Sequence, residues 1–201
     1  MSEINNILKD VKLPKVLKVK QEFSKYKIEN IEDTLIKKLN NKNLDIKIKS
    51  GSRIAITAGS RGISSYSILL KTIVDFVKKQ GAIPFIVPAM GSHGGGSDLG
   101  QKKILANLGI TEESMGCKVI SSMEVVQIGT CENNLPVYVD KNAYEADGII
   151  LFNRVKPHTS FRGKYESGLV KMLAIGLGKR KGAETIHSLR FENMADNILL
   201  S

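Results

Sequence analysis

The chain has 201 residues, 42% hydrophobic and 25% charged, so it is long enough to bury a core and has an ordinary globular composition. Thirty lysines and arginines against 20 acidic residues give a net charge of +10. The lysines are scattered, aromatic residues make up only 5% and tryptophan is absent, which argues against a nucleic-acid partner and favours an anionic small molecule.

The two cysteines, Cys117 and Cys131, predict no disulfide framework, and neither pairs with a histidine at a zinc-binding spacing. We therefore expect a reducing, cytoplasmic setting. Charges interrupt the first residues, which excludes a signal peptide there, and no apolar run approaches the length of a membrane span.

The first 50 residues are polar and rich in lysine, and they predict a peripheral strand and helix. We expect a strand over residues 16–23. Apolar residues recur at helical spacing over residues 28–41, and residues 44–49 alternate in the manner of a strand.

From Arg53 onward the pattern becomes strand, glycine loop, helix. Residues 53–57 predict a short strand and residues 58–63 its loop, after which Ser64 can cap a helix that ends at Gly81. The predicted buried face of this helix consists of Ile68, Leu69, Ile73, Phe76 and Val77.

The same order then repeats. Residues 83–89 predict a second strand, residues 90–96 a second glycine loop, and Ser97 a cap for a helix over residues 98–108. This βαβα order predicts a mostly parallel sheet flanked by helices, a Rossmann-like α/β domain in which ligands bind beyond the carboxyl ends of the strands.

The second half of the chain is less regular. Three short strands are expected at residues 117–122, 125–130 and 135–139, either as an antiparallel insertion or as further strands of the sheet. Residues 148–152 predict a buried strand, and two helices are expected over residues 167–177 and 183–200.

The last predicted helix runs to the final residues without a stop signal. We therefore expect residues 1–201 to be one domain of a longer protein, with a carboxy-terminal domain missing.

Two histidines follow predicted strands. His93 lies between Ser92 and three glycines, and His158 follows the strand that ends at Phe152. Both are expected to enter one crevice, where two imidazoles can take and give protons on opposite faces of a carbon atom. The alternative for either is an ordinary loop histidine.

Residues 153–187 hold two of the three histidines, five lysines and five glycines. Lys171 is a candidate nucleophile, although a lysine on a helix usually extends to solvent. Arg61 can hold a carboxylate, or it can be a solvated loop cation. The glycines after His93 match neither a P-loop nor GxGxxG, but such a loop can still hold a phosphate on its backbone amides.

Taken together, Arg61, Gly91-Ser-His-Gly94, Lys156-Pro-His158, Ser167-Gly-Leu-Val-Lys171 and His187 resemble the amino-terminal domain of the nickel-pincer lactate racemases. The resemblance extends over residues 53–201 and includes the spacings from His93 to His158 and from Lys171 to His187. Members of this family are racemases and epimerases of 2-hydroxy acids, and the resemblance implies the first domain of a two-domain enzyme.

The resemblance also implies a cofactor and a role for each residue. A nickel-pincer nucleotide would be tethered to Lys171 through a thioamide, and His187 would complete the nickel coordination, as suits a metal that accepts imidazole and sulfur ligands. His93 and His158 would be the acid and base, and Arg61 would bind the substrate carboxylate. Further cofactor contacts are expected from Gly94, Gly95, Lys156, Ser167 and Gly168.

The function this implies is inversion of the hydroxyl-bearing carbon of a small, lactate-like 2-hydroxy acid, with cofactor-maturation enzymes as partners. Two other readings stay open. One is a lyase or dehydratase that acts on a hydroxy acid with the same scaffold. The other is a metal- or nucleotide-binding module without enzymatic activity.

Overall fold

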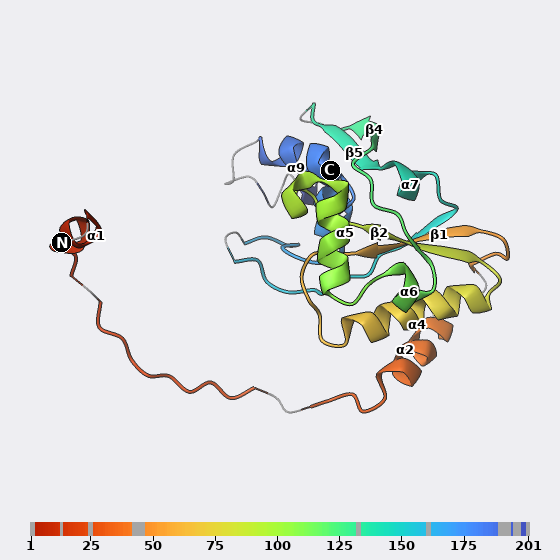
Figure 1. The fold of residues 1–201 in the computed structure, drawn as a ribbon, viewed down its shortest axis with the longest axis horizontal. Helices are drawn as coiled ribbons and strands as arrows, with labels where there is room; N and C mark the ends of the chain where they lie inside the picture. Colours follow the sequence, from red (N-terminus) through yellow and green to blue (C-terminus); the bar gives the residue numbers. More distant parts are fainter. Residues whose placement is uncertain are drawn as a thin grey trace.

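A four-stranded parallel sheet with the strand order β3-β2-β1-β6 forms the centre of the fold (Figure 1). Its strands are β1 (Arg53–Ala58), β2 (Ile83–Pro88), β3 (Lys118–Val119) and β6 (Gly148–Ile150). The structure is a computed structural model that describes residues 3–12, 14–23, 26–41, 47–131, 134–159, 162–188, 194 and 198–199. The predicted α/β class with a mostly parallel sheet is confirmed.

The two central strands are apolar because both of their faces are covered. In β1 and β2 every residue after the first is buried, and the strands pair in register from Arg53 opposite Ile83 to Ala58 opposite Pro88. Their carboxyl ends therefore lie at the same edge of the sheet, which is where ligands bind in open parallel sheets.

One face of the sheet packs against α4 (Tyr66–Lys79), α5 (Asp98–Asn107) and α6 (Glu112–Met115). Ile54 and Ile56 of β1 point into this core, together with Ile86 of β2 and Leu70 of α4. The predicted helix over residues 28–41 is present as α2 (Ile31–Asn40), which packs against α4 (Figure 1).

The opposite face packs against the second half of the chain. Ala55 of β1 and Val87 of β2 point into this second core, which contains Ala143 of α7 (Lys141–Tyr144) and Met172 of the π-helical turn η2 (Met172–Gly176). The strands β4 (Val125–Thr130) and β5 (Pro136–Asp140) form a separate antiparallel pair, as in the first alternative for this segment, whereas β3 joins the parallel sheet, as in the second.

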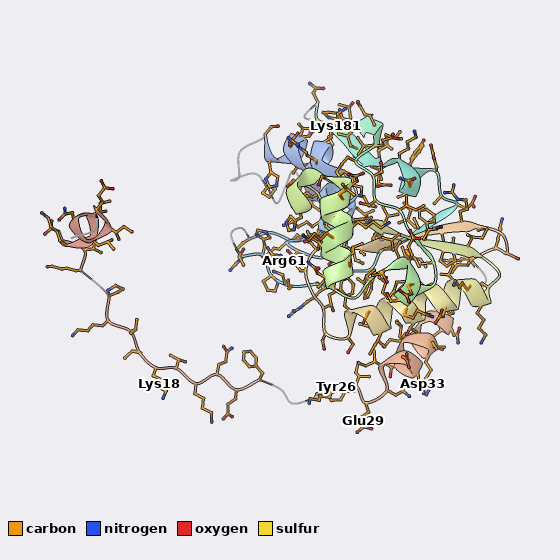
Figure 2. All side chains as sticks on the ribbon, viewed as in Figure 1. Lys18, Tyr26, Glu29, Asp33, Arg61 and Lys181 are labelled. Carbon is orange, nitrogen blue, oxygen red and sulfur yellow. The ribbon has the colours of Figure 1, made fainter. Side chains whose placement is uncertain are left out.

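The amino-terminal segment stands apart from the domain. Helix α1 (Glu3–Leu8) lies at the end of an extended stretch that leads away from the sheet, and Lys18 lies on that stretch (Figures 1 and 2). The strand predicted over residues 16–23 is wrong, because these residues are exposed and pair with no other described strand. Of the strand predicted over residues 44–49, residues 44–46 lie outside the described residues, and residues 47–49 form no strand.

The helix caps are partly as predicted. Ser97 Oγ accepts a hydrogen bond from the Gly100 amide at 3.2 Å and begins α5, as expected. Helix α4 begins after Ser65 instead of Ser64, and Ser65 has a φ of 57° without a capping hydrogen bond. Of its predicted buried face, Ile73, Phe76 and Val77 are buried, whereas Ile68 is 45% exposed. Tyr66, Leu70 and Val74 are buried as well.

The two carboxy-terminal helices also differ from the prediction. In place of one helix over residues 167–177 there are α8 (Leu169–Lys171) and η2, because the chain packs tightly at Gly176. A Cβ at Gly176 would lie 2.8 Å from the Ala89 carbonyl oxygen. Helix α9 (Lys179–His187) begins four residues earlier than predicted, and much of the segment beyond it lies outside the described residues.

Two glycines in helices provide a test of this packing. A Cβ at Gly100 in α5 would lie 1.9 Å from the Gly94 carbonyl oxygen, whereas a Cβ at Gly182 in α9 would meet Tyr138 at an ordinary 3.7 Å. We expect Gly100→Ala to lower the free energy of unfolding by about 1–3 kcal/mol through overpacking. Gly182→Ala, the matched control, should be neutral or stabilising by up to ~1 kcal/mol. Equal midpoints of urea unfolding for the two variants would contradict the packing described for the Gly94 loop.

Candidate functional site

A pocket of about 450 Å³ lies at the carboxyl edge of the sheet. Its walls come from the loop after β1 (residues 59–63), the loop after β2 (residues 89–93), the segment after β6 (residues 153–159) and the α8–η2 turn. His187, near the end of α9, completes it. The pocket therefore collects residues from five separate parts of the chain at the edge where the parallel strands end.

Two contacts, one within its own loop and one with the loop after β1, fix the position of His93. Its amide donates to the Met90 carbonyl at 3.1 Å, and its ring Nδ1 lies 2.5 Å from Ser60 Oγ in the loop after β1. Burial lowers the pKa of His93 below its ordinary value, and the positive charges of Arg61 and Lys171 lower it further. His93 is therefore mostly neutral at pH 7 and able to accept a proton.

His158 is placed by a carboxylate beneath its loop. Glu166 accepts hydrogen bonds from the His158 amide at 2.6 Å and from the Gly163 amide at 3.3 Å. The ring Nε2 of His158 lies 3.0 Å from the Lys171 amine. Burial lowers the pKa of His158, and the charges of Lys171 and Lys156 act in the same direction.

Lys171 lies at the centre of this group, on the short helix α8. Burial lowers the pKa of its amine, and the neighbouring charges of Lys156 and Arg61 lower it further. A larger fraction of the amine is consequently neutral than in a solvated lysine, which favours covalent attachment at this position. The alternative that Lys171 extends freely into solvent does not hold, because the side chain contacts His158 and lines the pocket.

His187 reaches the same pocket from the far end of α9. Burial lowers the pKa of His187, as does the charge of Lys171. The glycine-rich turn between Lys171 and His187 thus brings together two side chains that are sixteen positions apart in the sequence. Within the part of the chain that the structure describes, no group of three or more histidine, cysteine, aspartate or glutamate side chains is placed to hold a metal ion.

The described lining is strongly cationic. Arg61, Arg154, Lys156 and Lys171 line the pocket, and none of the described lining residues is acidic. Such a pocket is destabilised by repulsion when empty and favours anionic ligands, phosphates and carboxylates among them.

Some residues that shape the pocket were not identified from the sequence. The Tyr66 hydroxyl accepts a hydrogen bond from the Gly59 amide at 2.7 Å, and its ring packs against Phe152, so it fixes the loop that carries Ser60 and Arg61. Burial raises the pKa of Tyr66 to about 12, which keeps it a neutral hydroxyl. Its position directly after a glycine loop, at the start of an apolar helix, was the available signal.

Two hydrogen bonds fix the backbone that precedes Lys171. Asn153 Nδ2 donates to the Gly168 carbonyl at 2.9 Å, and the Lys156 amide donates to the Ser167 carbonyl at 3.3 Å. Lys156, Ser167 and Gly168 line the pocket, as expected of residues that contact a cofactor.

Gly94 and Gly95 lie in the short helix η1 (Gly94–Gly96), which packs against α5 and is not among the residues that line the pocket. Their expected contact with a cofactor stays a prediction. In the basic run from Lys179 to Lys181, Lys179 is fully buried and Lys181 stacks on the ring of Tyr138, away from Arg61 (Figure 2).

The fold and this pocket define an α/β domain with a ligand site at a parallel sheet edge. A protein-family model described as the lactate racemase N-terminal domain matches residues 2–198, and the chain belongs to this family. A search of curated proteins gave no match. Among the described residues, no helix has the length and apolar character needed to cross a membrane.

The charge of Lys171 lowers the pKa of all three histidines, which gives a test with one variant. Lys171→Met should raise each imidazole pKa, because removal of a nearby positive charge stabilises the protonated ring. Histidine signals followed by NMR from pH 4 to 9 measure all three at once. In the control Lys156→Met, only the pKa of His158 should rise clearly, since Lys156 acts on that histidine alone among the three. Unchanged pKa values in Lys171→Met would contradict this geometry.

Proposed function

We propose that this domain is the cofactor-carrying half of an isomerase that inverts the hydroxyl-bearing carbon of a small 2-hydroxy acid. The observation that carries the proposal is the convergence of His93, His158, Arg61, Lys171 and His187 on one pocket of about 450 Å³. Membership in the lactate racemase N-terminal domain family supports it.

The pocket fits a nickel-pincer nucleotide. The Lys171 amine has a lowered pKa that suits a covalent tether, and the cationic lining suits a phosphate. His187 supplies an imidazole near that tether, which is a ligand type that nickel accepts beside sulfur donors. Lys156, Ser167 and Gly168 would contact the nucleotide. When bound, this group supplies the metal centre and the ring that takes and returns hydride.

The protein's own residues would then position the substrate and move its proton. Arg61 would bind the carboxylate through its guanidinium group. A neutral His93 or His158 would remove the hydroxyl proton at a ring nitrogen, and the other histidine would serve the opposite face of the same carbon. A tether through Lys171 also removes the charge that lowers the pKa of both histidines, so their pKa values should rise when the cofactor is attached.

Two other functions use the same pocket. A lyase or dehydratase would convert one enantiomer of a hydroxy acid to an unsaturated or cleaved product instead of to its mirror image. A binding module would hold metal and nucleotide without turnover. Mass spectrometry of Lys171, together with optical rotation of each hydroxy-acid enantiomer incubated with the full-length protein, distinguishes the three.

The histidine pair gives a direct test of the racemase proposal. In the full-length, cofactor-loaded protein, His93→Gln and His158→Gln should each reduce racemisation about 10²–10⁴-fold, because each removes one proton-transfer group. The control Lys181→Gln alters a side chain that lies on Tyr138, outside the pocket, and should leave the rate unchanged. Wild-type racemisation rates in both histidine variants would reject their roles as acid and base.

The proposed role of His187 as a nickel ligand can be tested by metal content, without a measurement of activity. We expect His187→Ala to lower the nickel content of cofactor-loaded protein well below one atom per chain, since this change removes the only proposed protein ligand. Elemental analysis measures it. Mass spectrometry should show that the adduct at Lys171 is kept. Stoichiometric nickel in this variant would contradict the assignment of His187.

A further inference from the structure

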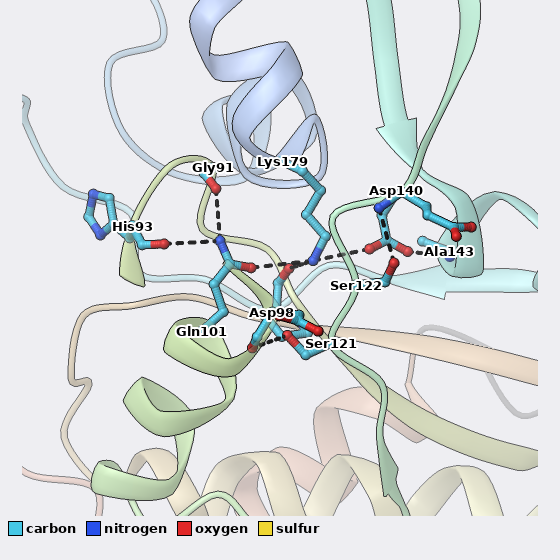
Figure 3. Close-up of polar contacts among 11 residues, drawn as sticks. Gly91, His93, Asp98, Gln101, Ser121, Ser122, Asp140, Ala143 and Lys179 are labelled. Atoms are coloured by element: carbon cyan, nitrogen blue, oxygen red, sulfur yellow. Dashed lines mark hydrogen bonds and ion pairs between the residues drawn. The ribbon is translucent and has the colours of Figure 1, made fainter. Parts of the chain in front are cut away.

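A buried cation lies behind the pocket and is not part of its lining. The side chain of Lys179 is fully buried, and its ammonium group donates to the Pro88 carbonyl at 2.6 Å. The same ammonium lies 3.1 Å from Asp140 Oδ2 and 3.4 Å from Gln101 Oε1 (Figure 3). It therefore joins the carboxyl end of β2, the end of β5 and helix α5.

Gln101 connects this cation to the His93 loop. Its side chain is fully buried, and Nε2 donates to the Gly91 carbonyl at 2.8 Å and to the His93 carbonyl at 3.2 Å (Figure 3). Because a lysine ammonium can only donate, Lys179 requires the amide oxygen to face it, which turns the amide nitrogen toward the loop. Lys179 on one side and the two loop carbonyls on the other therefore require the same orientation of Gln101.

Lys179 also belongs to the helix that carries His187. It is the first residue of α9, and His187 is the last. Lys179 has a φ of 54°, a left-handed conformation that costs a non-glycine residue about 1–3 kcal/mol and persists only where surrounding contacts hold it. The network of Asp140, Lys179 and Gln101 thus spans from the start of the helix of His187 to the backbone of His93.

A buried ion pair contributes little net stability, because the free energy of removing both charges from water offsets much of their attraction. Asp140 and Lys179 are both fully buried, and apolar residues of similar size often stabilise a protein as well or better. An ammonium held by two hydrogen bonds and an ion pair differs from an apolar contact because it sets distances and directions. This is the property that a loop carrying a proton-transfer residue requires.

We propose that Asp140, Lys179 and Gln101 form a positioning network that holds the His93 loop in register with the helix of His187. These residues touch neither substrate nor cofactor and act through the backbone of Gly91 and His93. The effect on turnover rests on the proposed function, whereas the placement of His93 does not.

The first experiment uses the 201-residue chain and its three histidines. In Gln101→Met the loop loses both hydrogen bonds at nearly unchanged volume. We expect the NMR signals of the His93 ring to shift, and its pKa to rise toward the ordinary value as the ring becomes more exposed, while those of His158 stay as in the wild type. Gln127→Met, on the exposed face of β4, is the matched control and should change none of the three.

Two results of that experiment would overturn the proposal. One is a folded Gln101→Met protein with unchanged His93 signals. The other is an equal shift of all three histidines, which would mean that Gln101 has a general structural role and does not position one loop.

The second experiment removes the cation without leaving a lone buried charge. In the double variant Lys179→Met, Asp140→Asn, the asparagine oxygen can still accept the Ala143 amide that Asp140 Oδ1 accepts at 2.9 Å. We expect shifts at His93 and His187 but not at His158. In the loaded full-length enzyme, kcat should fall on the order of 10- to 100-fold with little change in KM.

These outcomes separate the two proposals. If the wild-type full-length protein does not racemise a hydroxy acid but the predicted histidine shifts occur, the positioning network stands and the proposed function fails. If the wild type is a racemase and the double variant keeps both its kcat and its His93 signals, the network is rejected and the function stands.

Discussion

The crowding of positive charge at the carboxyl edge of the sheet is the constraint around which this domain is built. Arg61, Arg154, Lys156 and Lys171 share one pocket with three histidines, and the described lining contains no carboxylate to offset them. Burial and mutual repulsion together lower the pKa of Lys171 and of all three histidines. An anion that enters the pocket reduces this repulsion. The repulsion in the empty pocket therefore favours the binding of an anionic ligand.

A rigid scaffold is needed to keep like charges this close. The sheet supplies it through two central strands that are buried on both faces and paired in register, so that their loops leave the same edge. Local contacts then fix each loop: Tyr66 holds the loop of Arg61, Glu166 the loop of His158, and Gln101 the loop of His93. Each of these side chains binds backbone amides or carbonyls and so fixes the course of its loop.

The carboxylates of Glu166 and Asp140 lie near the site but do not line the pocket. They lie behind the pocket wall, where they bind backbone amides or balance Lys179. Carboxylates facing into the pocket would raise the pKa of the histidines and compete with anionic ligands. From its position behind the wall Glu166 still raises the pKa of His158, but burial and the charges of Lys171 and Lys156 lower it by more.

The sequence by itself determined the parallel α/β class and the two central strands, because apolar periodicity and glycine loops are local signals. It also provided the candidates His93, His158 and Arg61 from their loops, and the roles of Lys171 and His187 through the family resemblance. It did not reveal Tyr66 or Gln101 as supports, or Lys179 as a buried cation. It also predicted a strand over residues 16–23, which pair with no other strand among the described residues. Only the tertiary structure decided these points, because whether a lysine faces solvent or a carbonyl depends on elements up to 91 positions away in the chain.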